Sequence, residues 1–174
     1  MAKRAEASGA SRNDGESEVK RQRKRDTESG RKNSLKHGDD PFESPQITAR
    51  LWKEVYSTFM LHCSTELPFL HEEVFHLRVQ QASTARSADT QIFLLGMLAL
   101  TARFIPELSS AHHATDPLVS SEYYADAFSA RLDARSLTSE PALDRVQGLL
   151  MMSVYHWLMC RGQVAWMYIT IAKG

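Results

Sequence analysis

Apolar residues recur at helical spacing along most of the chain that follows residue 43. From Ile47 they recur every four residues, with further apolar side chains between them, which is typical of one broad apolar face on a helix of about four turns. Ser44 is expected to cap this helix, because Pro45 suits its first position. A second, shorter helix is predicted over residues 72–81, after a loop that contains Pro68. The apolar positions of these two helices are Ile47, Leu51, Trp52, Val55, Tyr56, Phe59 and Met60, and then Val74, Phe75 and Leu77.

The next segment is apolar on all sides of the predicted helix. Residues 92–102 form an apolar stretch of 11 residues with one threonine. A membrane span needs about 20 such residues, so this stretch predicts a helix buried by neighbours on nearly every face. We expect the helix over residues 89–104, with Asp89 as its cap and Pro106 beyond its end. Gly96 costs about 1 kcal/mol relative to Ala in a helix, so close approach of another helix is expected there.

Three further helices follow. The fourth is expected to begin near Asp116-Pro117, and the fifth at Ser139-Glu140-Pro141, with Gly162 as its end. The sixth, over residues 163–172, has eight apolar residues in ten. Their apolar positions are Val119, Tyr123, Tyr124, Ala127, Phe128 and Leu132 in the fourth, and Leu143, Val146, Leu150, Val154 and Trp157, together with Gln147, in the fifth. Because no segment alternates like a strand, the predicted fold is all-α, an irregular array of about six helices.

The sixth helix is an unusual end for a domain, because terminal residues are normally polar and exposed. It is rich in aromatic residues and is followed directly by Lys173 and Gly174. We therefore expect the array to be incomplete at this end, so that more chain or a partner would cover the helix. The aromatic residues Tyr155, Trp157, Trp166 and Tyr168 are predicted to belong to the core rather than to a ligand site.

Charge divides the chain into two parts. The 21 basic and 21 acidic residues cancel overall, but residues 1–40 hold 11 bases and 8 acids, and the rest hold 10 and 13. The same 40 residues contain 7 of the apolar residues, and all 15 aromatic residues lie from Phe42 onward. This composition predicts a disordered tail over residues 1–43 and a helical domain over residues 44–174.

The tail contains one basic run, with five positive charges in the six residues 20–25. Lys20, Arg21, Arg23, Lys24 and Arg25 form it. Such a run indicates a nuclear localisation signal read by importin, or a patch that binds nucleic acid through salt-dependent, non-specific contacts. A solvated run within a linker is the alternative.

No pattern in the chain predicts catalysis, a metal or a cofactor. Cys63 and Cys160 are too few for a disulfide framework or a cysteine-only zinc site. His71 and His76 are five positions apart, about 140° around a helix, and cannot share one ion. No nucleophile elbow or phosphate-binding glycine loop occurs. His71 is expected to cap a helix or to hydrogen-bond in the core, as is His156, and an enzyme is not expected.

Five stretches resemble the fungal-specific transcription factor domain, also called the xylanolytic transcriptional activator regulatory domain. This is the regulatory middle region of fungal regulators that carry a zinc binuclear cluster. The stretches are residues 67–71 (Leu-Pro-Phe-Leu-His) with Phe75, 94–104, 123–125 with 130–131, 141–155 and 162–172. The residues that define the resemblance most clearly are Pro68, Phe69, His71, Arg103, Tyr124, Gln147, Tyr155, Gly162 and Trp166.

The resemblance implies a nuclear regulator of transcription and departs from the family pattern in two ways. Members of the family usually bind DNA through a six-cysteine cluster that holds two zinc ions, and this chain lacks those cysteines. The similarity also stops inside a helix that continues in the family, which implies the N-terminal part of the regulatory domain. The protein would then bind DNA only through the missing cluster. The helices of this chain would contact protein partners or the rest of the regulatory domain, and no contact with a membrane is expected. The alternatives are a stand-alone interaction module that docks a partner through its last helix, and a small helical enzyme or metal protein.

Overall fold

Helix α4 (Ala88–Thr101) lies at the centre of the helical array in the computed structural model, which describes residues 42, 48–81, 87–111, 116–132 and 142–173. The other elements are α2 (Ala49–His62), α3 (Glu72–Gln81), the 3-10 turn η1 (Ala102–Phe104), α5 (Pro106–Ala111), α6 (Pro117–Arg131), α8 (Leu143–Leu158) and α9 (Gly162–Lys173). These ranges contain no strand, which confirms the all-α prediction. All six predicted helices are present. Helix α5 was not predicted, because Pro106 begins a short helix instead of only ending α4.

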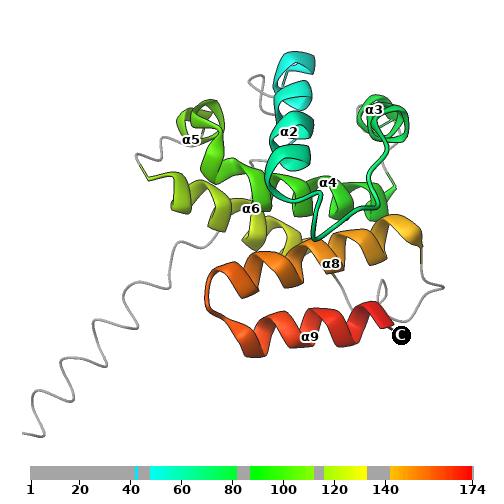
Figure 1. Ribbon diagram of the computed structural model, residues 1–174, viewed down its shortest axis with the longest axis vertical. Helices are drawn as coiled ribbons and strands as arrows, with labels where there is room; N and C mark the ends of the chain where they lie inside the picture. Colours follow the sequence, from blue (N-terminus) through cyan, green and yellow to red (C-terminus); the bar gives the residue numbers. More distant parts are fainter. Residues whose placement is uncertain (1–41, 43–47, 82–86, 112–115, 133–141, 174) are drawn as a thin grey trace, which may run out of the picture. The chain divides into compact units, whose positions relative to one another are not determined.

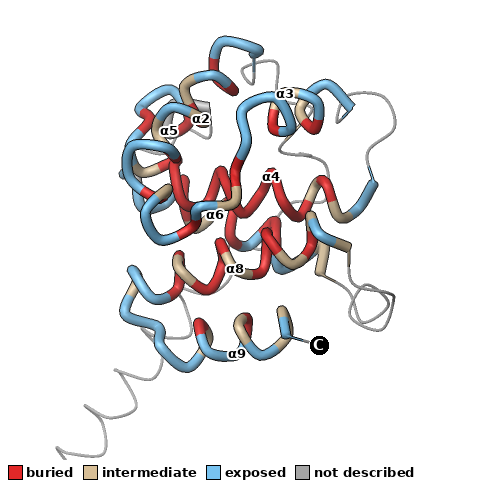
Figure 2. The backbone as a smooth tube through the Cα atoms, turned by 45° about the vertical axis from the view of Figure 1, so that its right-hand side comes forward, coloured by how far each residue is buried: buried red, intermediate tan, exposed pale blue. Residues whose placement is uncertain are grey.

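The helices pack in a definite order around α4. Helices α2, α6 and α8 contact α4, and α9 packs against α8 on the side away from α4 (Figure 1). Every residue from Ile92 to Ala102 is buried, as predicted for a helix that is apolar all round. Figure 2 shows that α4 is buried along most of its length, whereas α9 is largely exposed. The buried residues of α9 are Ala165 and Tyr168. The core therefore lies where α2, α6 and α8 meet α4.

Two glycines set the distance between α4 and α8. A Cβ on Gly96 would lie 3.2 Å from the backbone oxygen of Gly148 and 3.2 Å from Met151 Cβ. A Cβ on Gly148 would lie 2.8 Å from Ile92 Cγ2 and 3.1 Å from the Ile92 backbone oxygen. The prediction of close helix approach at Gly96 is confirmed, and Gly148 supplies the other half of the crossing.

The helix starts differ from two of the predicted caps. Thr48, in an extended conformation, caps α2 through a hydrogen bond from Leu51 N to Thr48 Oγ1. The prediction of Ser44 as the cap is therefore wrong. Ser87 caps α4, because its Oγ accepts a hydrogen bond from Thr90 N at 3.1 Å, which leaves Asp89 inside the first turn. Helix α6 begins at Pro117, where a helix start was expected, and Asp116 caps it with its carboxylate 2.9 Å from Leu118 N. The predicted opening of α8 at residues 139–141 lies outside the described residues, and the described helix begins at Leu143.

The turn between α8 and α9 reverses the chain within three residues. Helix α8 ends at Leu158, and Cys160 adopts a left-handed conformation with a φ of 57°. The backbone N–H of Arg161 then donates to His156 O at 2.8 Å, which closes the end of α8. Gly162 is the first residue of α9, so the prediction that it ends α8 is wrong. A cysteine takes the conformation that a glycine commonly supplies at a helix end.

Candidate functional site

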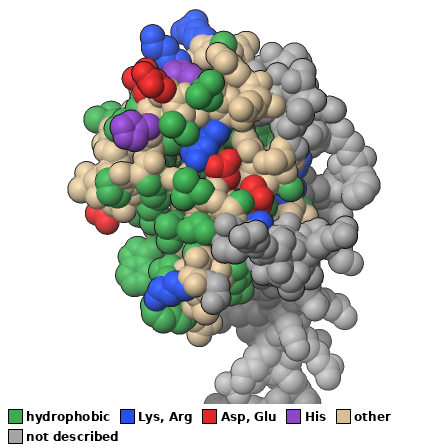
Figure 3. All heavy atoms as spheres, turned by 90° about the vertical axis from the view of Figure 1, so that its right-hand side faces the viewer, with side chains coloured by type: hydrophobic (Ala, Val, Ile, Leu, Met, Phe, Trp, Pro, Cys, Tyr) green, Lys and Arg blue, Asp and Glu red, His purple; other side chains and the backbone are tan. Residues whose placement is uncertain are grey.

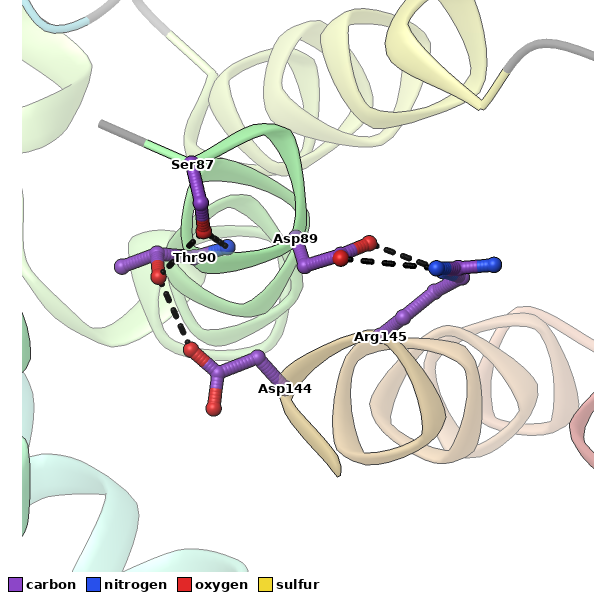
Figure 4. A network of polar contacts seen from close by, with 5 residues as sticks. All are labelled: Ser87, Asp89, Thr90, Asp144 and Arg145. Carbon is purple, nitrogen blue, oxygen red and sulfur yellow. Dashed lines mark hydrogen bonds and ion pairs between the residues drawn. The ribbon is translucent and has the colours of Figure 1, made fainter. Parts of the chain in front are cut away.

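The first turns of α4 and α8 are joined by a partly buried polar network (Figure 4). Arg145 on α8 donates to both carboxylate oxygens of Asp89 on α4, at 2.8 and 3.4 Å. Thr90 on α4 donates from Oγ1 to Asp144 on α8 at 2.9 Å, and its hydroxyl also lies 2.9 Å from Ser87 Oγ. Each carboxylate also lies in the first turn of its own helix, where the backbone dipole favours negative charge. Both carboxylates are thus paired, and the network connects helices without offering a free acid or base.

Arg78 brings α3 into the same network. Its Nη2 lies 2.6 Å from Asp144 Oδ1, and its guanidinium stacks over the Phe93 ring at 4.2 Å. Phe75 and Arg78 are the buried residues of α3, so this ion pair is a main attachment of the helix. Apolar periodicity cannot reveal such an attachment, since the contact is made by a charged side chain.

A second polar group lies where α6, α8 and α9 meet. Arg161 in the turn forms an ion pair with Glu122 on α6. His156 stacks on Tyr168 with ring centroids 5.3 Å apart, and the Tyr168 hydroxyl lies 3.0 Å from Ser129 Oγ. Burial lowers the pKa of His156, and the charge of Arg161 lowers it further. His156 is therefore buried in the core, but its Nδ1 has no hydrogen-bond partner there, whereas His71 is exposed.

The buried hydroxyl and thiol groups of the core are in environments that suppress ionisation. Burial raises the pKa of Tyr155 to about 12, and the Glu122 carboxylate adds to this effect. Burial also raises the pKa of the Cys63 thiol. A thiol of this kind holds its proton at neutral pH, which is the reverse of what a nucleophilic cysteine needs.

The pair α8 and α9 exposes large apolar side chains, although it was predicted to bury them. Tyr155 and Tyr168 are buried, but Trp157 is 71% exposed and Trp166 is 65% exposed. The prediction that these four aromatic residues form core is therefore wrong for both tryptophans. Leu158 and Met167 are exposed as well. Figure 3 shows hydrophobic side chains gathered over the lower part of the molecule, where α9 lies. We call Trp157, Leu158, Trp166 and Met167 the α8–α9 apolar set.

The nine residues that define the family resemblance differ in how far they are buried. Tyr124, Gln147 and Tyr155 are buried; Phe69 and Arg103 are partly buried; Pro68, His71, Gly162 and Trp166 are exposed. Two of them are joined by a hydrogen bond of 3.5 Å from Gln147 Nε2 to the backbone oxygen of Phe69. This bond attaches the loop before α3 to α8.

Other predicted features have no structural counterpart to report. The basic run at residues 20–25 lies outside the described residues. In the described part of the chain no group of three or more His, Cys, Asp or Glu side chains could hold a metal ion. A six-cysteine zinc cluster does not fit a chain with two cysteines, one of them buried at position 63. None of the described helices is long and apolar enough to cross a bilayer.

Comparison with known families places almost all of this helical array within one of them. The family described as "Fungal specific transcription factor domain" matches residues 50–174. No curated protein and no solved structure matches the chain. The matched range contains the α4–α8 crossing, both polar groups and the α8–α9 apolar set.

Proposed function

Because this chain belongs to the family of the fungal specific transcription factor domain, we propose that it acts as the regulatory region of a fungal transcription factor. The observation that carries the proposal is the extent of the match, which runs from the first turn of α2 through α9. The described residues are connected as a helical scaffold, in which the carboxylates of Asp89, Asp144 and Glu122 are paired with arginines of neighbouring elements. A role in contacts between proteins suits such a scaffold better than a reaction does.

We propose that DNA recognition depends on a zinc cluster outside these 174 residues. The two cysteines cannot form the six-cysteine cluster that the resemblance implies. The basic run in the tail offers phosphate contacts without base contacts, which confer affinity but no sequence preference. Purified chain is thus expected to bind duplexes of different sequence equally, and to release them at high salt. Strong preference for one duplex at high salt would contradict this division of roles.

The basic run is proposed to direct the protein to the nucleus. Lys20, Arg21, Arg23, Lys24 and Arg25 provide the closely spaced cations that importin binds. A fluorescent fusion of the whole chain is expected to accumulate in the nucleus and to lose that accumulation when Arg23, Lys24 and Arg25 are replaced by alanine. Lys3 and Arg4, replaced in the same way, provide a control within the tail. Accumulation that survives the first replacement would overturn the assignment.

A stand-alone interaction module is the second candidate, and the α8–α9 apolar set favours it. Two tryptophans that are 71% and 65% exposed are unusual on a surface that meets only water. Light scattering after size exclusion distinguishes the candidates. A discrete complex of fixed stoichiometry would favour the interaction module. A monomer in light scattering that also regulates transcription when it is fused to a DNA-binding domain would favour the regulatory region.

The direct test of the proposed function is a tethering experiment. The whole chain is fused to an unrelated DNA-binding domain in a fungal host, and a reporter gene with the matching binding site is measured. We expect transcription to differ from that given by the DNA-binding domain alone. Equal transcription from the two, at equal protein levels, would contradict the proposal.

A further inference from the structure

Helix α3 buries few of its side chains and lies at the edge of the helical array (Figure 1). Six of its ten residues are exposed, among them the apolar Val74 and Leu77, and its buried residues are Phe75 and Arg78. Helix α4, by comparison, buries eleven of its fourteen residues. The attachment of α3 to the array therefore depends largely on two side chains.

The first attachment is aromatic and joins α3 to α2. The Phe75 ring meets the Trp52 ring edge-on, with centroids 6.0 Å apart, and stacks on the Tyr56 ring with centroids 5.4 Å apart. Phe75 is the apolar side chain that α3 buries completely. Separation of α3 from α2 thus exposes mainly this one ring to water, whereas separation of α4 from its neighbours would expose the core.

The second attachment is electrostatic and joins α3 to α4 and α8. The Arg78 guanidinium lies over the Phe93 ring at 4.2 Å, and its Nη2 is 2.6 Å from Asp144 Oδ1. The other oxygen of this carboxylate accepts a hydrogen bond from Thr90, and Asp144 lies in the first turn of α8. When Arg78 leaves, Asp144 keeps both Thr90 and the favourable end of the helix dipole. The ion pair can therefore open without leaving the Asp144 carboxylate alone.

The loop that precedes α3 is fixed separately from the helix. Its apolar residues Leu67 and Leu70 are buried, and the backbone oxygen of Phe69 accepts a hydrogen bond from Gln147 on α8. His71, which connects this loop to α3, is exposed. The loop thus provides a fixed base for movement of the helix that follows it.

We propose that α3 is a releasable strap. It leaves the array as a unit when the pair of Arg78 and Asp144 opens, while the helices around α4 stay folded. Release uncovers the Phe93 ring and the Trp52 ring, which are 0% and 7% exposed in the closed form. Elements held by few buried contacts open at a lower free energy than the core does. The strap goes beyond the proposed regulatory function and does not depend on it, because it rests on the contacts of α3.

Native-state hydrogen exchange of the whole chain, measured amide by amide at increasing urea concentration, tests for the strap. A free helix of ten residues is too short to be stable in water, so the α3 amides exchange whenever the helix is released. We expect the amides after Phe75 to exchange at least tenfold faster than those in the centre of α4, roughly the difference between local and global opening. Their exchange should depend weakly on urea, because release exposes little surface. Equal rates and equal urea dependence in α3 and α4 would overturn the proposal.

Two substitutions separate release of α3 from unfolding of the whole domain. Arg78→Met should speed α3 exchange about tenfold, since it removes the ion pair that holds the closed form. Arg161→Met, which removes the more exposed ion pair with Glu122, is the matched control and should leave α3 exchange unchanged. Tyr168→Ala, at a buried residue that contacts α6 and α8, should speed α4 exchange about a hundredfold without changing α3 exchange.

Tyr168→Phe guards against an alanine variant that does not fold. It keeps the ring and loses the contact with Ser129, so α4 exchange should rise about fivefold. If α3 exchange rises together with α4 exchange in either Tyr168 variant, α3 opens only when the domain unfolds, and the proposal is overturned. Unchanged α3 exchange in folded Arg78→Met would also overturn it. The urea series on the wild type decides the matter without any variant.

Discussion

Gly148 on α8 lies against the backbone of Ile92 on α4 so closely that no side chain fits between them. A Cβ added at position 148 would be 2.8 Å from Ile92 Cγ2 and 3.2 Å from the Ile92 carbonyl carbon. Ile92 is completely buried and branched at Cβ, so it has little freedom to move aside. The crossing of the two helices therefore depends on the absence of a side chain at Gly148.

Gly148→Ala is expected to destabilise the protein by about 1–2 kcal/mol, although alanine is the better helix former. The overlap with Ile92 outweighs the gain in helix propensity. Gly162→Ala is the matched control, because a Cβ at Gly162 meets nothing within 4 Å, and it should leave stability unchanged or slightly higher. Urea unfolding followed by circular dichroism measures both. A Gly148→Ala protein as stable as Gly162→Ala would contradict the close crossing.

The ion pair between Arg78 and Asp144 is expected to matter more than the one between Arg161 and Glu122. The first pair has side chains 10% and 19% exposed, and in the second both are 44% exposed. In double-mutant cycles with Arg78→Met and Asp144→Leu, or Arg161→Met and Glu122→Leu, we expect a coupling of about 1–3 kcal/mol for the first pair. For the second we expect about 0–1 kcal/mol. Equal couplings would show that burial does not separate the two pairs.

His156 is expected to make stability depend on pH. Its pKa in the folded protein is lowered from 6.5, so as the pH falls the unfolded chain takes up a proton at His156 before the folded protein does. The contribution of neutral His156 to the free energy of unfolding is therefore fully present above the pKa that His156 has in the unfolded chain. It is lost as the pH falls through about 6.5 towards the pKa of His156 in the folded protein. His156→Phe, which can keep a ring against Tyr168, should show a weaker loss of stability over this range. Thermal melts between pH 5.5 and pH 8, about the window of histidine titration, provide the measurement. Identical pH profiles for both proteins would exclude His156 as the source.

The exposed tryptophans are expected to contribute little to stability. Trp157→Gln with Trp166→Gln should change the free energy of unfolding by about 0.5 kcal/mol or less per site. Tyr168→Ala should cost about 3 kcal/mol, since Tyr168 is buried, stacks on His156 and bonds Ser129. Chemical unfolding compares the three proteins. A large loss in the tryptophan variant would show that these side chains pack within the chain after all.

The sequence predicts helices well here where apolar periodicity is strong, and less well where single contacts decide. The apolar stretch over residues 92–102 predicts the buried position of α4, and Gly96 predicts a close helix crossing. Cap identity is harder, because Ser87 and Asp89 are both good caps and the choice depends on Asp89 pairing with Arg145, 56 residues away. The exposure of Trp157 and Trp166 could not be predicted from composition. The sequence shows that these side chains are apolar, but whether another helix covers them depends on how the helices pack.

Tethered transcription with a matched set of variants tests the central claim most directly, namely that this helical array is a regulatory region. The whole chain, the variant Trp157→Gln with Trp166→Gln, and the core variant Gly148→Leu are each fused to an unrelated DNA-binding domain and measured on one reporter at equal protein levels. We predict that the whole chain changes transcription, that the core variant abolishes the change, and that the tryptophan variant reduces it while remaining folded. Transcription equal to that of the DNA-binding domain alone for all three fusions would contradict the account.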